Sequence, residues 1–234
     1  MLPYQLLVSL HILLVVAWLG MDVAVFTSSF WVRNVKLSTD ARLTLRRFGG
    51  LMDMGPRSSL VGMLGVGLLL SYYGGWAFGW LPQMVVWVII ALLAVWLWAI
   101  WQQYLAVHDA ADGRDIGGRV FFVRQFRTFD LMLRLVLALV LIGLGVASFF
   151  NVLGETYGWL NTKLILFGLI LANGIAIRVV SVESPVIIGE IVRYGSTPER
   201  EARFNRAVRR VYPYVLMIWG LIVVLLLLGV IKPF

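Results

Sequence analysis

The sequence His11-Ile-Leu-Leu-Val-Val-Ala-Trp18-Leu-Gly20-Met-Asp22 belongs to an apolar segment, residues 1–25, that is long enough to cross a lipid bilayer as a helix. His11, Trp18 and Asp22 are spaced at i, i+7 and i+11, so they share one face of that helix. A histidine surrounded by lipid is costly because its ring nitrogens lose their hydrogen bonds to water. We therefore expect this face to point into the protein or toward a ligand.

Composition places the chain among integral membrane proteins. Its 234 residues are 61% hydrophobic and 14% charged, with a mean hydropathy of +0.90, whereas soluble domains carry about 25% charged residues. The apolar runs leave no room for a separate soluble domain. The sequence contains no cysteine, which excludes disulfides, thiolate metal sites and cysteine-ligated iron–sulfur clusters. The candidate metal-ligating nitrogens belong to His11 and His108, with eight methionines as softer ligands.

Six stretches are apolar, and each is close to the ~20 residues that a membrane-spanning helix requires. They cover residues 4–25, 51–73, 84–107, 130–152, 159–180 and 211–231. The first is not expected to be a cleaved signal peptide, because no basic region precedes its apolar core. The sequence thus predicts an all-α bundle of six transmembrane helices that forms a single transmembrane domain over residues 1–234.

The basic residues predict the orientation of this bundle. Except for Lys163 and Lys232, every lysine and arginine lies in or beside the first, third and fifth connections between the predicted spans. Because basic connections stay on the cytoplasmic side of a membrane, we expect these three inside and both termini outside. We accordingly expect a multi-pass protein of the inner (plasma) membrane. It would be embedded in the lipid bilayer as a homo-oligomer or as a subunit of a membrane complex.

The fifth connection is long and contains a predicted helix. Its stretch Ser196-Thr-Pro-Glu199 is typical of a helix start, because a hydroxyl residue precedes a proline and an acidic residue in the first turn. A helix over about 198–211 would carry a basic face suited to the anionic cytoplasmic leaflet. That face consists of Arg203, Arg206 and Arg210. Nucleic acid is not an expected partner of these charges.

The predicted topology sets the depth of each polar group in the bilayer. With a rise of about 1.5 Å per residue, His11 lies about 10 Å below the outer boundary and Lys163 about 6 Å below it, in the same leaflet. His108 ends the third span on the opposite side of a hydrocarbon core about 30 Å thick. His11 and His108 therefore cannot both ligate one haem. His108 occupies a polar helix end, where a histidine interacts favourably with the helix C-terminus.

The groups in the outer leaflet each have a structural and a functional interpretation. Lys163 can extend its ammonium to the water boundary, and His11 can hydrogen-bond to a neighbouring helix or act as an axial ligand or proton-handling group. Gly65 and Gly145 fall near the depth of His11, so they either allow close helix packing or leave space for a flat macrocycle. Met63 is the nearest soft second ligand by depth.

A second polar layer is expected toward the cytoplasmic side. Its charged members should pair with one another, because an unpaired charge at this depth would be costly. They are Asp22, Asp53, Arg57, Asp130, Arg134 and Arg178. Asn173, in the middle of the fifth span, is expected to hydrogen-bond to another helix.

Several motifs resemble those of a known family. His11 followed by Val16-Ala-Trp18-Leu-Gly20 resembles the first helix of the HemJ-type protoporphyrinogen oxidases and of the related CopD-like membrane proteins. The stretch Trp159-Leu-Asn-Thr-Lys163-Leu is similar to that family's Trp-Leu-x-x-Lys-Leu. Further likenesses are Arg46-Arg47 with Pro56, Arg203-Phe204-Asn205 with Tyr212-Pro213, and Ile231-Lys232-Pro233-Phe234. The resemblance covers spans one, two, five and six, while spans three and four look like an added hairpin.

The resemblance implies a haem-dependent membrane oxidoreductase. In that family the first-helix histidine is taken to bind haem b and the lysine is required. His11 would then be the axial ligand, Trp18 would pack along the same face, and Lys163 would hold a propionate or a substrate carboxylate. The implied activity is electron transfer to or from a hydrophobic donor, such as a porphyrinogen or a quinol.

Two other functions stay open from the sequence. One is transport of copper or another small solute, as the copper-linked relatives suggest, although the methionines lack the Met-x-x-Met spacing expected for Cu(I). The other is a structural subunit whose polar residues only hold helices together.

Overall fold

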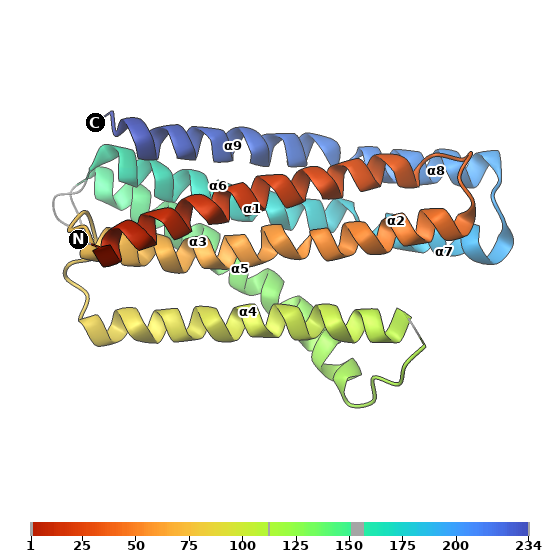
Figure 1. Ribbon diagram of the computed structural model, residues 1–234, viewed down its shortest axis with the longest axis horizontal. Helices are drawn as coiled ribbons and strands as arrows, with labels where there is room; N and C mark the ends of the chain where they lie inside the picture. The colour runs from red at the N-terminus through yellow and green to blue at the C-terminus, as the bar shows by residue number, and fades with distance from the viewer. Residues whose placement is uncertain (1, 112, 151–156, 234) are drawn as a thin grey trace. The chain divides into compact units, whose positions relative to one another are not determined.

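The structure of the chain is a computed structural model that describes residues 2–111, 113–150 and 157–233. Throughout these residues the secondary structure is helical and no β-strand occurs, which confirms the predicted all-α class (Figure 1). The helices are α1 (Leu2–Val32), α2 (Thr39–Met52), α3 (Met54–Tyr73), α4 (Gln83–Ala111), α5 (Arg119–Phe149), α6 (Gly158–Val180), α7 (Glu183–Tyr194), α8 (Pro198–Arg209) and α9 (Tyr212–Ile231). Residues 151 and 152 of the predicted fourth span, and Phe234 of the C-terminal motif, lie outside the described residues.

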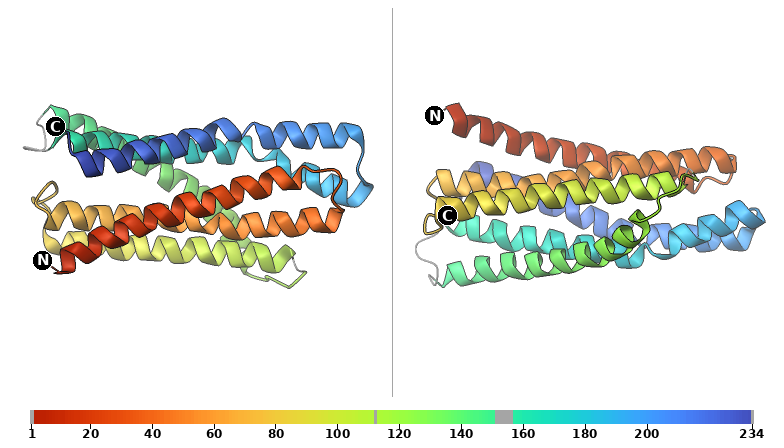
Figure 2. Two further views of the ribbon diagram at one scale, coloured as in Figure 1. Left: turned by 45° about the horizontal axis from the view of Figure 1, so that its top comes forward. Right: turned by 90° about the horizontal axis from the view of Figure 1, so that it is seen from below.

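Contacts along the chain divide it into two compact units. Unit 1 consists of Met1–Met21 and Asp53–Leu133, and unit 2 consists of Asp22–Met52 and Arg134–Phe234. Helices α1 and α5 therefore contribute to both units, while α3 and α4 belong to unit 1. Within unit 1, α3 and α4 run side by side in both views of Figure 2.

In unit 1, α1 and α3 pack against each other in antiparallel directions. Three glycines of α3 face side chains of α1, as shown by the atoms that a Cβ added at each glycine would meet. The glycines that come later in α3 face residues that come earlier in α1. The pairs are Gly67 with His11, Gly62 with Leu14, and Gly55 with Met21. A Cβ on Gly55 would lie only 2.7 Å from the Met21 Cβ, so the missing side chain lets the helices approach closely. Tyr4 and Trp76 extend the pairing with an edge-to-face ring contact at 6.0 Å.

Helix α4 contacts both α3 and the first part of α5 in unit 1. On the α3 side, an added Cβ on Gly65 would lie 3.4 Å from Ile90 Cδ1 and 3.5 Å from Leu93 Cδ1. On the α5 side, Trp96 Nε1 donates a hydrogen bond to Asp130 Oδ1 at 2.8 Å, and both side chains are buried. A buried carboxylate is tolerated only when donors satisfy it, so this bond orders the α4–α5 contact.

In unit 2, glycines bring α5 and α6 together in the same way. A Cβ on Gly145 of α5 would lie 2.7 Å from the Asn161 carbonyl oxygen of α6. Reciprocally, a Cβ on Gly168 of α6 would lie 2.9 Å from the Ala138 carbonyl oxygen of α5. Each helix thus presents a bare backbone position to the other, which is typical of close packing between membrane helices.

Helices α6 and α9 form the most extensive helix pair in the described part of the chain. Asn173 Nδ2 in the middle of α6 donates a hydrogen bond to the Tyr214 carbonyl oxygen of α9 at 2.7 Å. This contact confirms the predicted interhelical hydrogen bond of Asn173. Tyr214 lies in the first turn of α9, so this bond joins the middle of α6 to the start of α9.

Five helical segments of the described residues are long and apolar enough to cross a membrane. They are Pro3–Val32, Gln83–Ala110, Arg119–Phe149, Gly158–Tyr194 and Pro198–Ile231. They indicate a multi-pass membrane protein. Helix α3, which occupies the predicted second span, is not among them. Its first turns carry Pro56, Arg57 and two serines, and glycines interrupt the apolar residues that follow, so its hydropathy is lower.

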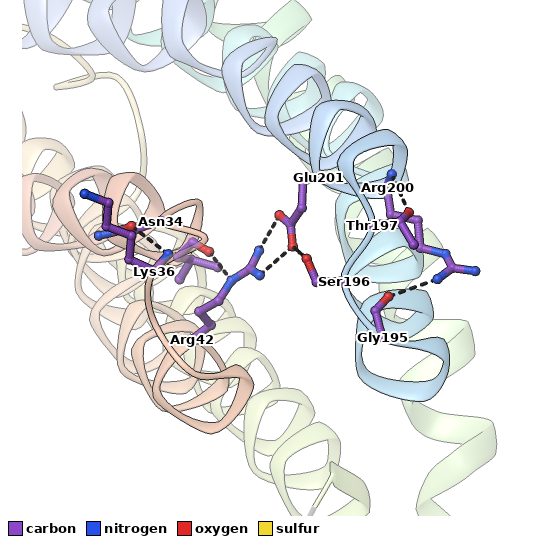
Figure 3. Close-up of polar contacts among 9 residues, drawn as sticks. Asn34, Lys36, Arg42, Gly195, Ser196, Thr197, Arg200 and Glu201 are labelled. Atoms are coloured by element: carbon purple, nitrogen blue, oxygen red, sulfur yellow. Dashed lines mark hydrogen bonds and ion pairs between the residues drawn. The ribbon is translucent and has the colours of Figure 1, made fainter.

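Helices α7 and α8 form a hairpin in unit 2 with an apolar inner side. Thr197 caps α8 by accepting a hydrogen bond from the Arg200 backbone N–H at 3.3 Å, and Pro198 lies in the first turn, in line with the predicted helix start (Figure 3). The buried cluster under the hairpin consists of Val32, Ile187, Ile188, Ile191, Phe204 and Ala207. One face of α8 is therefore used for packing against α7 and the end of α1.

Candidate functional site

The predicted polar face of α1 is turned toward the interior of unit 1 at His11 and Trp18. His11 is half-buried, and its Cε1 lies 3.8 Å from the position of an added Cβ on Gly67 of α3. Val15 and Trp18, which follow on the same face, are buried, and only 4% of Trp18 is exposed. The imidazole therefore lies against α3 at Gly67.

The glycine beside His11 is Gly67, whereas Gly65 faces α4. Depth in the membrane led us to Gly65, because the two positions differ by only about 3 Å along a helix axis. Successive residues of a helix are rotated by about 100° around its axis. Gly65 and Gly67, two residues apart, therefore lie on nearly opposite faces of α3. Met63, the predicted soft ligand, is half-buried one turn before Gly67 on α3. Sequence spacing alone could not select between these faces.

Lys163 lies in unit 2, one turn after Trp159 at the start of α6. Its Nζ lies 5.6 Å from the centre of the Trp159 ring, within the range of a cation–π contact. The Nζ of Lys232 lies 5.5 Å from the same ring. The Lys163 Nζ is also 2.5 Å from the position of an added Cβ on Gly229 of α9. Sequence reasoning missed Lys232 and Gly229 as neighbours, although Lys163 and Lys232 were the two basic residues expected outside.

The predicted site residues are distributed over both units. His11, Trp18 and Gly65 belong to unit 1, and Lys163 and Gly145 belong to unit 2. Gly145 is buried, and the space beside it is filled by the α6 backbone. Of its two predicted interpretations, close helix packing is the one that its contacts support.

Two of the acids expected in the second polar layer bind tryptophan donors that the sequence did not predict. Asp22 Oδ2 in unit 2 accepts a hydrogen bond from Trp219 Nε1 of α9 at 2.7 Å. Asp130 in unit 1 receives the indole bond described above. Arg57 and Asp53 form an ion pair one turn apart at the start of α3, as expected for this layer. Two of these acids are therefore satisfied by indole N–H groups, and Asp53 by an arginine.

The C-terminal motif residues connect α8 and α9 to the end of α1 in unit 2. Arg33 Nη1 donates a hydrogen bond to Asn205 Oδ1 at 2.6 Å, and its guanidinium lies 5.2 Å from the centre of the Tyr212 ring. The Tyr212 ring packs against Phe26 at 4.6 Å. Phe204 is fully buried in the hairpin cluster. These contacts give the motif a structural role.

A buried ion pair, which sequence reasoning also missed, joins α2 to α8 in unit 2. Arg42 donates two hydrogen bonds to Glu201, Nη1 to Oε1 at 2.7 Å and Nη2 to Oε2 at 2.9 Å (Figure 3). Arg42 Nε donates to the Val32 carbonyl oxygen, and Ser196 Oγ donates to Glu201 Oε1, each at 2.7 Å. Burial alone would raise the pKa of the Glu201 carboxyl, but the bonds from Arg42 and Ser196 outweigh it and hold the pKa below its usual range.

The donor set limits which metal species the protein could hold. His108 lies near the end of α4, where its ring contacts Tyr104 at 6.0 Å. Within the described ranges, no group of three or more His, Cys, Asp or Glu side chains converges. A bare ion such as zinc needs about four side-chain or water ligands, whereas haem iron needs only axial ligands from the protein.

No family model, curated protein or solved structure matches this chain. The resemblance to the HemJ-type proteins consequently depends on the motifs quoted above.

Proposed function

We propose that this protein binds haem b in the membrane and that His11 is an axial ligand. The observation that carries the proposal is the half-buried imidazole of His11 on an apolar helix, against Gly67. A neutral imidazole nitrogen is a common ligand of haem iron, and a histidine in an apolar membrane helix is by default a functional-site candidate. The resemblance of the first helix to the HemJ-type proteins supports the same assignment.

The proposal includes six membrane crossings, with α3 as the second. It is supported by the antiparallel pairing of α1 with α3, which extends from Tyr4 and Trp76 to Met21 and Gly55. The rise from Tyr4 to Met21 is about 26 Å, close to the ~30 Å of a hydrocarbon core. A helix of moderate hydropathy can span when its polar and small residues face other helices. With basic connections inside, both termini would lie outside the inner (plasma) membrane.

The residues of this chain would have distinct roles in that function. One ring nitrogen of His11 would hold the iron, while a hydrogen bond at the other nitrogen would orient the ring. Trp18 packs along the same face of α1. Lys163, in unit 2, would hold a carboxylate with its ammonium. When bound, haem b would supply one-electron transfer to or from a hydrophobic donor such as a porphyrinogen or a quinol.

Exposed apolar side chains on α4 support contact with lipid and with further membrane helices. Met84, Leu92 and Trp98 expose 78%, 63% and 59% of their surface. Such a surface is stable only in an apolar environment. In the proposed protein it would face acyl chains and the helices of a second copy or of another subunit, through which a redox partner could be recruited.

Absorption spectroscopy tests the haem proposal. Protein expressed with ample haem supply and purified in mild detergent is expected to show a Soret band and the pyridine haemochrome spectrum of haem b. His11→Ala should lose the band. His108→Ala is the matched control, because it removes the other histidine, and it should keep the band. A colourless wild-type protein would refute haem binding, and an unchanged band in His11→Ala would refute the ligand.

A further inference from the structure

We propose that the first turns of α5 form a self-association surface, through which two copies of this chain pair with their α5 helices parallel. The surface lies in unit 1, on the side of α5 that carries Phe122, Gln125, Phe129 and Met132. We call these four residues the α5 seam. The pairing depends on the membrane placement proposed above, and it needs no haem.

A surface hollow of about 440 Å³ lies on this side of the helix. Its lining residues are Phe121, Phe122, Gln125, Phe126, Thr128 and Phe129. Phe121 and Phe129 expose 71% and 57% of their surface. Because all the lining residues belong to α5, no second element of the described chain forms an opposite wall. A helix from another molecule would supply that wall.

The α5 seam begins before the most apolar part of the helix. Helix α5 has 31 residues and is about 46 Å long, whereas the hydrocarbon core of a bilayer is ~30 Å thick. Its largely apolar part follows Asp130 and already rises about 27 Å between Leu131 and Phe149. The turns that carry Phe121 and Phe129 would therefore extend past the acyl chains. Exposed apolar patches at that level mark contacts with other proteins.

The spacing of the seam residues is that of a coiled coil. They are separated by three, four and three positions, as the a and d residues of a heptad are. The basic connections orient every copy in the same way in a membrane, so two copies would meet with their α5 helices parallel. In a parallel pair, each seam residue meets its own counterpart near the twofold axis. The seam is therefore complementary to itself, and a second copy is the partner that it fits.

The charges of this stretch lie away from the seam. Arg124 and Arg127 occupy the outer heptad positions c and f, while the flanking e and g positions between residues 121 and 132 carry no charge. Arg119 occupies an earlier e position, but it forms an ion pair with Asp109 at 3.2 Å. Two copies can therefore face each other without bringing unpaired like charges together, which would oppose their association.

Gln125 gives the apolar seam one polar pair. Its amide is exposed, and among the described residues it has no hydrogen-bond partner. An amide is both a donor and an acceptor, so the two Gln125 side chains of a pair can bond to each other across the twofold axis. A polar residue at such a position fixes the register of the two helices.

Phe126 orders the aromatic residues of the seam. Its ring stacks on that of Phe122 with centroids 5.4 Å apart, and it lies 6.1 Å from the ring of Phe129. Phe126 is itself buried, and one turn later Asp130 accepts the hydrogen bond from Trp96 of α4. The seam rings are thus held in place beforehand, which lowers the entropy that they lose when a second copy binds.

Single-cysteine cross-linking in native membranes tests the pairing, because the chain has no cysteine of its own. Gln125→Cys and Phe129→Cys would be expressed separately and oxidised with copper phenanthroline. We expect each to give a disulfide-linked dimer of twice 26.3 kDa, since the counterparts of a seam residue approach closely enough for a disulfide. Arg127→Cys is the matched control, because Arg127 lies on the opposite side of the same turns, and it should stay monomeric.

A pair of phenylalanine variants measures the strength of the association. Phe129→Ala removes a seam ring and should raise the dissociation constant of the dimer by about tenfold, as expected for an aromatic residue in an interface. Phe48→Ala removes a ring from α2, outside the seam, with 47% of Phe48 exposed, and it should leave the constant unchanged. Energy transfer between labelled copies in detergent provides the measurement.

Three outcomes would overturn the proposal. Equal cross-linking of Arg127→Cys and Gln125→Cys would indicate random collision. No dimer from either seam variant would leave lipid as the cover of the hollow, and a cross-link to a different protein would replace the second copy as the partner. A double variant that combines His11→Ala with Gln125→Cys should still form the dimer, so a failure of the haem proposal stays distinguishable from a failure of the pairing.

Discussion

Arg42 and Glu201, 159 residues apart in the sequence, form a buried ion pair with two hydrogen bonds that joins α2 to α8. Only 2% of Arg42 is exposed, and its guanidinium also lies 5.7 Å from the centre of the Phe204 ring. A guanidinium removed from water is stable only while its partners remain in place. The pair therefore connects the first predicted cytoplasmic connection to the last one.

Removal of Glu201 should strongly destabilise the protein. Glu201→Ala leaves the Arg42 charge buried without its carboxylate, and the expected cost is about 3–5 kcal/mol of unfolding free energy. The measurement is the free energy of unfolding, or the Tm, in detergent. Glu190→Ala is the matched control on α7, because it removes an exposed ion pair with Arg203, for which the expected cost is below about 1 kcal/mol. Equal losses in the two variants would contradict the structural role of the buried pair.

The same pair predicts a dependence of stability on pH. Glu201 lies on the charged helix α8, outside the apolar part of the last span, and its pKa is held below its usual range. The unfolded carboxyl has a pKa of about 4.3, so the stabilisation is fully present above that value. It is lost as the pH falls through the lower pKa of the folded state.

Thermal unfolding between pH 6 and pH 3 would measure this loss. The wild type is expected to lose more stability than Glu201→Gln over the range, because the variant has no carboxylate to protonate. Parallel curves for the two proteins would show that other groups control the acid sensitivity.

The hydrogen bond between Trp96 and Asp130 should contribute to the stability of unit 1. Trp96→Phe keeps an aromatic ring but removes the indole donor to a carboxylate that is fully buried. The expected cost is about 1–3 kcal/mol, because a buried acceptor loses a partner. Trp98→Phe, two residues away with 59% of Trp98 exposed, is the control and should change the Tm little. An unchanged Tm in Trp96→Phe would show that water or another donor replaces the indole.

The positions of elements along the chain could largely be predicted from local sequence. Apolar length located the segments that can span, and the proline and hydroxyl signals at Thr197 and Pro198 located the start of α8. The hydrogen bond of Asn173 to another helix was also predictable, because an amide in an apolar helix needs such a partner. For α3 apolar length was a weaker guide. The sequence predicted a span there, but Arg57 and the serines lower its hydropathy, and α3 is not among the segments apolar enough to cross a membrane.

The partners of individual side chains could not be predicted, because they depend on helix rotation and register. On α3, Gly67 contacts His11 of α1, whereas Gly65, only two residues earlier, contacts α4. The contact of Lys163 with Gly229 likewise requires the antiparallel register of α6 and α9.

Composition and apolar periodicity were sufficient to identify an all-helical membrane protein, because lipid allows no backbone polar group to stay unpaired and selects long apolar helices. The spacing of His11 and Trp18 was sufficient to define a common face of α1. Tertiary packing determined which groups that face and its neighbours meet. It placed Gly67 beside His11, Trp96 beside Asp130, and two lysines around Trp159, because these contacts arise only when separate helices align.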